Sequence, residues 1–281
     1  MLRRSLPSLS GRRVLITGAA RGIGAALAER LHQRGAQVAL AGLEPELLAE
    51  VAGALDAPWW TCDVTDRPQV EEVVDAAADR LGGLDVVVAN AGVAAQVPLV
   101  GGDPEIFERI QRVNVLGTYF TFRAAGPHIS HRHGYALAVS SLGGAVHVPL
   151  LGAYSASKAG VEALGNTMRV ELAPTGAKAG VAYFAELDTD MTSRGFDTQA
   201  ARRFLGERSI TKVSPLRLGI DALERGIARR SRYVVAPAWA GPILPIRMLA
   251  QPVVELAVRR RVAPALAVAR QESVELTTPQ P

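Results

Sequence analysis

Short apolar runs and longer amphipathic stretches alternate along most of the chain. The apolar runs predict strands over 14–17, 37–41, 59–62, 85–89, 135–140, 180–184 and 232–236. The stretches between them predict helices over 22–34, 45–55, 67–81, 105–131, 154–173 and 215–230. Continuous apolar strands that alternate with helices are typical of a buried parallel sheet. We therefore expect a single α/β domain, with a doubly wound parallel sheet and helices on both faces.

The first predicted strand runs directly into a glycine-rich turn. Residues 14–24 read VLITGAARGIG, so that Gly18, Gly22 and Gly24 stand between the strand and a helical pattern. Glycines let the backbone turn sharply and approach a pyrophosphate closely, and a helix N-terminus offers free N–H groups to an anion. A strand before such a turn and a helix after it is the context that a dinucleotide-binding loop requires.

A second pattern joins Ser141, Tyr154 and Lys158. Lys158 follows Tyr154 by four positions in a predicted helix, so both side chains project from one face. We expect the Lys158 ammonium to lower the pKa of Tyr154, which would make the phenol a useful general acid and base. Ser141, thirteen positions earlier at the end of a strand, could hold the reacting oxygen. Taken alone, Tyr-x-x-x-Lys is also common as an ordinary surface pair.

Two asparagines complete a recognisable order of motifs. Asn90-Ala91-Gly92 follows the strand at 85–89, and Asn114 lies in an apolar helical stretch, VNVLGTYF. With the glycine turn and the Ser-Tyr-Lys set, the chain resembles the short-chain dehydrogenase/reductase family in its shorter subtype, over roughly residues 11–236. The resemblance implies a Rossmann-type fold. It also implies NAD(P)-dependent hydride transfer between the nicotinamide and a secondary alcohol or its ketone.

The resemblance assigns roles to particular positions. Tyr154 would exchange the proton, Ser141 would bind the carbonyl oxygen, Lys158 would tune Tyr154 and bind the nicotinamide ribose, and Asn114 would bend its helix and hold a relay water. An interior asparagine that merely satisfies its own hydrogen bonds fits the same position. The expected cofactor-binding positions are Gly18, Arg21, Gly22, Ile23, Gly24, Gly42, Asp63, Val64, Asn90, Ala91, Gly92, Tyr154, Lys158 and Thr189.

The end of the second strand bears on the choice between NAD and NADP. An acidic residue there binds the 2′-hydroxyl of the adenosine ribose and repels a 2′-phosphate. Gly42 stands where NAD-dependent relatives usually carry Asp, and Arg21 could pair with a 2′-phosphate. Glu44 could still supply the missing carboxylate if it points inward. The residues favour NADP over NAD.

One loop departs from the family pattern. Relatives usually carry Pro-Gly after the strand at 180–184, whereas this chain has Phe184-Ala185. The following Asp188-Thr189-Asp190-Met191 does match, and the resemblance places Thr189 at the nicotinamide carboxamide. Residues 190–212 are expected to form a mobile substrate lid.

Composition and charge narrow the class of protein. The chain has 281 residues and is 48% hydrophobic, which is ample for one large domain. A single cysteine, Cys62, excludes an internal disulfide and fits a reducing compartment, and no signal-peptide pattern begins the chain, so we expect a cytoplasmic protein. No nucleic-acid recognition motif accompanies the basic residues. His128, His131 and His133 are expected to end a helix rather than to bind a metal.

The C-terminal third is basic and continues past the usual end of the family. Residues 201–261 hold thirteen Arg or Lys against four Asp or Glu. We expect an N-terminal extension over 1–10, the catalytic domain over 11–238 and an apolar and basic extension over 239–281. Prolines from 237 to 252 argue against a long amphipathic or spanning helix. We expect the apolar stretch to be ordered and buried, with membrane contact as the less favoured alternative, and the last twenty residues to be frayed.

The predicted function is thus an NAD(P)-dependent oxidoreductase acting on a hydrophobic alcohol or ketone. A rival class is a dinucleotide-binding sensor or scaffold without turnover, although such a protein needs only the cofactor-binding half of the motifs. An epimerase or dehydratase usually has different glycine spacing and a longer substrate domain. The family resemblance also implies a homo-oligomer, assembled through the helices at 105–131 and 154–173.

Overall fold

Seven parallel strands form one sheet at the centre of the molecule. The computed structural model describes residues 6–195, 198–205, 213–272 and 274–278. The strands are β1 (Arg13–Thr17), β2 (Gln37–Gly42), β3 (Trp59–Thr61), β4 (Val86–Ala89), β5 (Tyr135–Val139), β6 (Lys178–Phe184) and β7 (Tyr233–Ala236). Their order in the sheet is β3-β2-β1-β4-β5-β6-β7. The strand order reverses between β1 and β4, and ligands bind beyond the carboxyl ends of strands at such a switch point.

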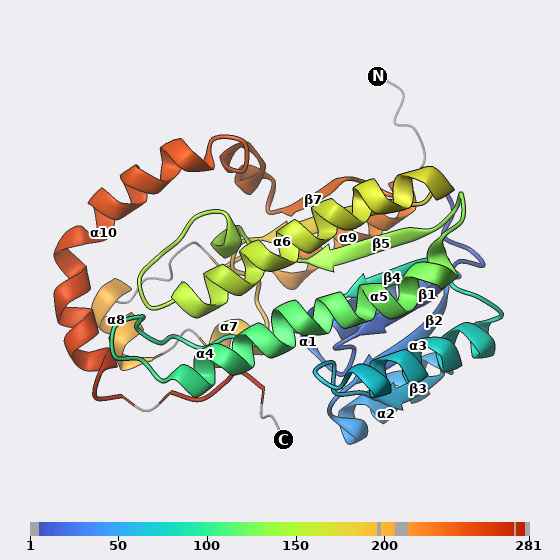
Figure 1. Ribbon diagram of the computed structural model, residues 1–281, viewed down its shortest axis with the longest axis horizontal. Helices are drawn as coiled ribbons and strands as arrows, with labels where there is room; N and C mark the ends of the chain where they lie inside the picture. The colour runs from blue at the N-terminus through green and yellow to red at the C-terminus, as the bar shows by residue number, and fades with distance from the viewer. Residues whose placement is uncertain (1–5, 196–197, 206–212, 273, 279–281) are drawn as a thin grey trace.

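Helices cover both faces of this sheet, as the sequence predicts (Figure 1). The longer ones are α1 (Gly22–Gln33), α2 (Pro45–Leu55), α3 (Arg67–Leu81), α4 (Pro104–Gln111), α5 (Gly117–Ile129), α6 (Gly152–Leu172), α9 (Leu216–Arg229) and α10 (Arg247–Ala269). Two short ones, α7 (Asp190–Gly195) and α8 (Gln199–Leu205), follow β6. Single 3-10 turns occupy Leu142–Gly144, Ala173–Thr175 and Ala238–Ile243.

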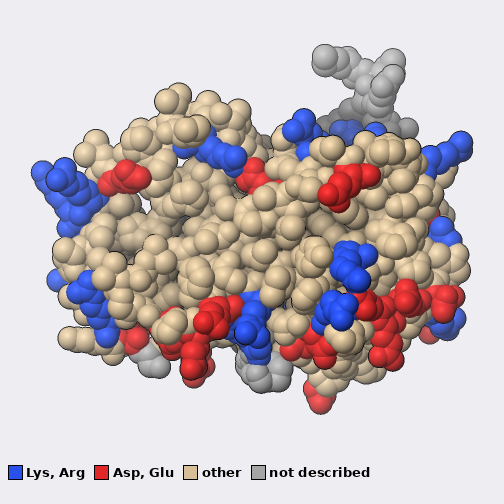
Figure 2. Space-filling view, in the orientation of Figure 1, with Lys and Arg blue, Asp and Glu red and all other residues tan. Residues whose placement is uncertain are grey.

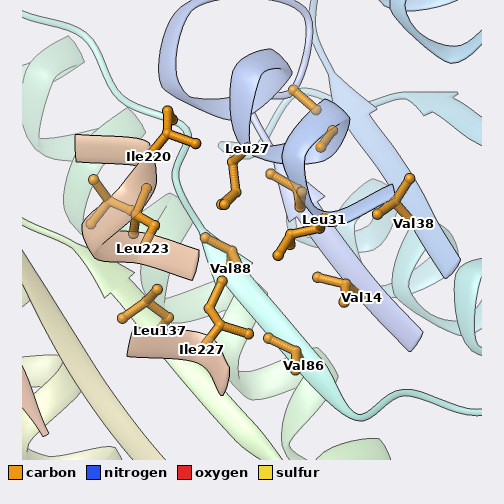
Figure 3. Packing of buried hydrophobic residues seen from close by; sticks show 14 of the residues in the cluster. Val14, Leu27, Leu31, Val38, Val86, Val88, Leu137, Ile220, Leu223 and Ile227 are labelled. Carbon is orange, nitrogen blue, oxygen red and sulfur yellow. The ribbon is translucent and has the colours of Figure 1, made fainter. Parts of the chain in front are cut away.

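Alternate residues of each strand feed two separate cores, because successive side chains point to opposite faces. On one face, Val14 and Ile16 of β1 pack with residues of α1 and α9, which include Leu31 and Leu223 (Figure 3). On the other face, Leu15 packs with residues of α3, α5 and α6. The sheet is therefore buried on both sides, which explains why its strands read as continuous apolar runs.

The predicted helix over 105–131 is interrupted. It consists of α4, a π-helical turn over Arg112–Leu116 and α5, which ends at Ile129. His131 and His133 therefore lie beyond the helix, not at its end as expected. A π turn inserts one extra residue into the hydrogen-bond ladder of a helix. Such turns are frequent at functional sites. Asn114 stands in the middle of this turn.

The C-terminal segment is more regular than its prolines suggest. A helix of 23 residues, α10, begins at Arg247, after Pro237, Pro242 and Pro245, and holds Pro252 and Pro264 within it. Both prolines are exposed, and α10 follows a curved path at one end of the molecule (Figure 1). The last twenty residues are not frayed throughout, because α10 reaches Ala269 and Thr277 is buried. In the described ranges, no helix is long and apolar enough to cross a membrane.

Two expectations about segments remain predictions. The division of the chain at residues 10 and 238 is one of them. The other is the mobile lid over 190–212, of which residues 196–197 and 206–212 lie outside the described residues.

The packing of α9 on the sheet can be tested by a pair of leucines on that helix. Leu223 is fully buried, whereas Leu218 is 36% exposed. We expect Leu223→Ala to lower the free energy of unfolding by about 2–5 kcal/mol, since a cavity remains where the side chain was. Leu218→Ala should stay within about 0.5 kcal/mol of the wild type. Urea unfolding would measure both, and equal losses would contradict this description of the core.

Candidate active site

One large cavity lies beyond the carboxyl ends of the strands, at the switch point of the sheet. Its volume is about 660 Å³. The glycine turn after β1, the end of β2 and the segment after β4 line one part of it. Ser141, Tyr154 and Lys158 line another part, together with the loop after β6 and residues of α10. The cavity thus brings together the two groups of motifs that lie more than a hundred residues apart in the sequence.

The three glycines of the turn meet different constraints. Gly18 has a φ of +63°, and a side chain there would approach the Ala91 Cα to 2.7 Å. A side chain at Gly24 would collide with the Gly18 carbonyl oxygen. Gly22, with a φ of +56°, faces open space and lines the cavity. Gly18 and Gly24 therefore allow the turn to pack closely, while Gly22 keeps the backbone accessible to a ligand.

The N-terminus of α1 points its first N–H groups toward this space. No side chain caps the helix, and the earliest intrahelical bond runs from Ala25 N–H to the Arg21 carbonyl at 3.3 Å. Gly22 and Ile23 both line the cavity. Uncapped N–H groups at the positive end of a helix dipole form a site for phosphate oxygens. This cradle fits the pyrophosphate of a dinucleotide.

Asn90 fixes the position of the glycine turn. Its side-chain amide donates to the Thr17 and Gly18 carbonyls, each at 3.0 Å. The backbone N–H groups of Asn90 and Ala91 donate to Thr17 Oγ1 at 3.1 and 3.3 Å. These bonds join the end of β1 to the end of β4. Asn90 therefore stabilises the glycine turn through its hydrogen bonds, and the residue also lines the cavity.

Arg21 and Glu44, the two residues that bear on cofactor choice, form an ion pair. Arg21 Nε donates to Glu44 Oε2 at 2.8 Å, and a second guanidinium nitrogen of Arg21 contacts the other carboxylate oxygen. Asp190 of α7 lies 3.7 Å from Arg21 Nη1. Gly42 stands beside them with room for a side chain, because a Cβ there would meet only ordinary contacts at 3.4 Å or more.

Asp63 and Val64 lie at the far side of the same region. Asp63 Oδ1 accepts from the Thr65 N–H at 2.8 Å, and both residues line the cavity. The carboxylate therefore fixes its own turn and also faces the cavity. Val64 is buried, and Gly117 of α5 is required next to it, since a side chain at residue 117 would come within 2.7 Å of Val64 Cγ2.

Ser141 and Tyr154 meet at the opposite part of the cavity. Ser141 Oγ accepts from the Gly143 N–H at 3.1 Å and lies 3.3 Å from the Phe184 carbonyl, to which it can donate. Burial raises the pKa of Tyr154, and a hydrogen bond with Ser141 opposes this rise. The expected lowering of this pKa by Lys158 is therefore wrong for this structure. Burial of the side chain removes water from the phenolate, and this cost exceeds the opposing effect of the hydrogen bond with Ser141.

Lys158 is the most unusual group of the site, since it is only 4% exposed. Burial lowers the pKa of Lys158 to about 8. Its Nζ donates to the Val139 carbonyl at 3.0 Å and lies 5.7 Å from the centre of the Tyr154 ring. A side chain at Gly92 would come within 3.2 Å of Lys158 Nζ. Gly92 therefore leaves the space that the ammonium occupies.

Asn114 is completely buried within the π-helical turn. Its Oδ1 accepts from the Val93 N–H at 2.8 Å, and its Nδ2 donates to the Val93 carbonyl and to Ser157 Oγ at 3.0 and 2.8 Å. The side chain thus joins the segment after β4 to Ser157 of α6, the residue that precedes Lys158. Both N–H groups of its amide and one acceptor position of Oδ1 are used within the protein, so Asn114 positions these elements.

The loop after β6 lines one side of the cavity, although it lacks the Pro-Gly that is usual in the family. Phe184 is buried, and the Ala185 N–H donates to the Ala236 carbonyl at 3.1 Å, which continues the β6–β7 pairing by one residue. Thr189 lines the cavity, and its Oγ1 lies 3.4 Å from the Leu187 carbonyl and 3.3 Å from Thr192 Oγ1.

All the site positions expected from the sequence line this cavity except Gly24 and Asn114, which lie just behind it.

The C-terminal extension supplies a wall that no family motif identified. The residues of this wall are Trp239, Ile243, Ala250, Val254, Ala257, Val258, Arg261, Thr277 and Thr278. Thr277 returns to the body of the molecule, where its N–H donates to the Ala94 carbonyl and its Oγ1 accepts from the Ala94 N–H, both at 3.0 Å. The only signal in the sequence was the apolar character of 239–258. In the part of the chain that the structure describes, no group of three or more His, Cys, Asp or Glu could hold a metal ion.

Comparison with known proteins assigns the family. A family model described as short chain dehydrogenase matches residues 12–200. The 11-beta-hydroxysteroid dehydrogenase-like 2 protein of Arabidopsis thaliana is 30% identical over 261 residues, which are 88% of this chain and 80% of that protein. A short-chain dehydrogenase/reductase of Hericium erinaceus, eriH, is 37% identical over 179 residues, 59% of this chain and 70% of that protein.

Two other similarities have a narrower meaning. Glycine betaine reductase ATRR of Emericella nidulans is 37% identical over 211 residues, but these are 73% of this chain and only 16% of that protein. The crystal structure of gox2181 superimposes with a TM-score of 0.73 at 22% identity, covering 80% of this chain and 93% of that one, which supports the fold alone.

The chain belongs to the short-chain dehydrogenase family. It is an oxidoreductase that acts on CH–OH or C=O groups with NAD(P).

The buried ammonium of Lys158 predicts a pH-dependent stability. Its pKa is near 10.5 when exposed and about 8 in the folded protein. Between these values the unfolded chain binds more protons, so stability rises with pH there and the cost of burial is complete below about pH 8. We expect Lys158→Met to raise the free energy of unfolding by about 1–3 kcal/mol at pH 7, with a smaller gain at about pH 9.5.

Urea unfolding without cofactor at both pH values would measure this difference. Lys178→Met is the matched control, because Lys178 is an exposed residue at the start of β6. A Lys158→Met variant that is less stable than the wild type at pH 7, with no dependence on pH, would contradict the burial cost.

Proposed function

We propose that the protein is an NADP-dependent oxidoreductase that transfers a hydride between the nicotinamide and a hydrophobic secondary alcohol or ketone. One observation carries this proposal. A single cavity is lined both by an uncapped glycine turn suited to a pyrophosphate and by Ser141, Tyr154 and Lys158. The bound cofactor would supply the hydride chemistry, while the protein orients the reactants and moves the proton.

In the proposed mechanism, Tyr154 exchanges a proton with the substrate oxygen. The phenol is buried, so its protonated form is stable and can donate to a carbonyl oxygen that becomes an alkoxide. Ser141 binds the same oxygen, and its Oγ is held in place by the Gly143 N–H. In the oxidative direction the Tyr154 phenolate would accept the proton of the alcohol instead. The raised pKa of Tyr154 favours this transfer.

Lys158 and Asn114 act through position and charge. The ammonium of Lys158 lies beside the Tyr154 ring, where a positive charge stabilises a developing phenolate more strongly than it would in water. With a pKa of about 8, this group can also gain or lose a proton near neutral pH. Asn114 bridges Val93 and Ser157, and so it fixes α6 relative to the cofactor-binding segment after β4.

The apolar wall supports a hydrophobic substrate. The cavity lining includes Trp239, Ile243, Val254 and Val258 of the extension, as well as Leu151 and Met191. Such a surface favours a ligand that leaves water together with it. The proposal of a homo-oligomer is supported by exposed apolar residues on the expected helices, which are Phe107, Leu116, Tyr119 and Val170.

Turnover by Tyr154 can be separated from cofactor binding. We expect Tyr154→Phe to lower kcat for secondary alcohols and ketones by at least about a thousandfold, since the proton donor is lost. The dissociation constant for the cofactor should change by less than about threefold, because the glycine turn is untouched. A steady-state assay and a fluorescence titration would measure these quantities.

Tyr119→Phe is the matched control, since Tyr119 is 46% exposed on α5 and lies outside the cavity lining. Near-normal turnover in Tyr154→Phe would overturn the catalytic assignment. Cofactor binding without turnover in the wild type, over a broad screen of alcohols and ketones, would favour the sensor or scaffold instead.

The choice of NADP rests on Arg21 and on the missing acid at Gly42. For a 2′-phosphate to bind, Arg21 would exchange part of its pairing with Glu44 for the phosphate. We expect the wild type to have a higher kcat/KM with NADPH than with NADH. Gly42→Asp should reverse the preference by at least about tenfold through carboxylate–phosphate repulsion, and the site has room for the side chain.

Glu44→Gln separates the two possible roles of Glu44 in this assay. If Glu44 only restrains Arg21, the variant should bind NADPH more tightly and leave the KM for NADH unchanged. If the wild type prefers NADH and Glu44→Gln raises the KM for NADH, Glu44 is the ribose partner and the proposal of NADP is wrong.

A further inference from the structure

Large apolar side chains are exposed along the first half of α10 and just before it. Ile246, Met248, Leu249, Val253 and Leu256 are between 50% and 86% exposed. This exposure corrects the expectation that the apolar stretch is buried as a whole. Contiguous exposed apolar surface on a soluble domain marks an interaction site more often than chance packing.

The exposed residues form one of two neighbouring stripes on the helix. Leu249, Val253, Leu256 and Arg260 follow the four-three-four spacing of a single helix face. The same spacing, shifted by one residue, gives Ala250, Val254, Ala257 and Arg261, all of which line the cavity. The inner stripe therefore belongs to the site already described. The outer stripe, which we call the outer face of α10, faces away from the cavity and is not covered by the described residues.

The charges around the outer face are strongly one-sided. The helix carries Arg247, Arg259, Arg260 and Arg261, and Arg270 follows its last residue, but it holds only one acid, Glu255. Arg247 is bound by Glu162 at 2.8 and 2.9 Å, and Glu255 accepts from Gln251. For residues 259–261, the described part of the chain provides no acidic partner within salt-bridge distance. Figure 2 shows the surface over the start of α10 as mostly uncharged, with basic groups at the left end of that helix.

We propose that the outer face of α10 docks on an anionic lipid bilayer. The apolar stripe would enter the boundary between headgroups and acyl chains, and Arg259 and Arg260 would meet lipid phosphates. Trp239, 47% exposed at the start of the extension, has the amphipathic ring that is enriched at membrane interfaces. The helix would lie in the plane of the interface, so its length need not span the membrane.

The charges favour a lipid surface over a second copy of the chain. In a two-fold contact, each outer face meets itself, so the arginine run of one copy would need acids on the other. The outer face offers only Glu255, which is already hydrogen-bonded. Anionic headgroups provide the missing charge. The outer face of α10 lies outside the cavity lining, whereas Trp239 also lines the cavity. The docking proposal does not depend on the proposed reaction.

Vesicle binding by the full-length protein tests the proposal. We expect flotation with vesicles of equimolar phosphatidylcholine and phosphatidylglycerol at low salt, with weaker binding at high salt and little binding to pure phosphatidylcholine. The emission of Trp239 should shift to the blue on binding, and the Trp239→Phe variant should show whether Trp59 and Trp60 contribute. Absence of binding to the anionic vesicles would overturn the proposal.

Two pairs of substitutions assign the binding to the outer face. Leu249→Gln with Leu256→Gln should weaken binding to the anionic vesicles by at least about tenfold, since two anchoring side chains become polar. Arg259→Gln with Arg260→Gln should weaken it by about 30-fold and remove most of the salt dependence. Leu47→Gln is the control, because Leu47 is 39% exposed on α2, at the opposite end of the molecule from α10 (Figure 1), and should bind as the wild type does.

The same variants distinguish a lipid surface from a protein partner. Light scattering after size exclusion should give one molar mass for the wild type and the leucine pair, with circular dichroism unchanged. If the leucine pair retains vesicle binding, the outer face is not the lipid-binding surface and the proposal is wrong. If the leucine pair has a lower molar mass than the wild type, the outer face is an interface between copies and the proposal is also wrong.

Discussion

The close approach of the end of β1 to the end of β4 is the constraint on which the site depends. Gly18 packs against Ala91 at a distance that excludes any side chain, and four hydrogen bonds, three from Asn90 and one from Ala91, tie the two strand ends together. Because the strand order reverses between these two strands, their loops diverge and leave the cavity open beyond them. The glycine turn then presents the N-terminus of α1 to that space. Gly92, two residues beyond Asn90, leaves the room in which Lys158 lies.

The buried Lys158 illustrates the conflict between stability and function at this cavity. Burial of the ammonium lowers its pKa to about 8, and burial of the Tyr154 phenol raises the pKa of that group. Both shifts come from the same exclusion of water, and both disfavour the charged form of the group. The loop after β6 and α10 line this cavity, and burial makes the charged forms of the two groups costly. The same exclusion of water strengthens any electrostatic interaction with a bound reactant.

The C-terminal extension links the cavity to the outside of the molecule. Its helix contributes one stripe to the cavity wall and leaves the next stripe exposed, and Thr277 bonds to Ala94 beside the segment that Asn114 holds. The family model matches residues 12–200, so this wall lies outside the residues that the model matches. Differences in this region can change the substrate without any change in the groups around Tyr154.

The sequence by itself determined the parallel sheet and the boundaries of α2 and α3 to the residue, because apolar runs and helix periodicity are local patterns. The motifs and the family resemblance also named most of the residues on one side of the cavity, but not the wall that the C-terminal extension supplies. Only the tertiary structure decided the pKa direction of Tyr154, because four-residue spacing gives proximity to Lys158 but says nothing about burial. It also decided the pairing of Arg21 with Glu44, which lie 23 positions apart. The course of α10 was decided in the same way, since its prolines disfavour a helix locally, whereas its packing on α8 and the cavity depends on residues far away in the chain.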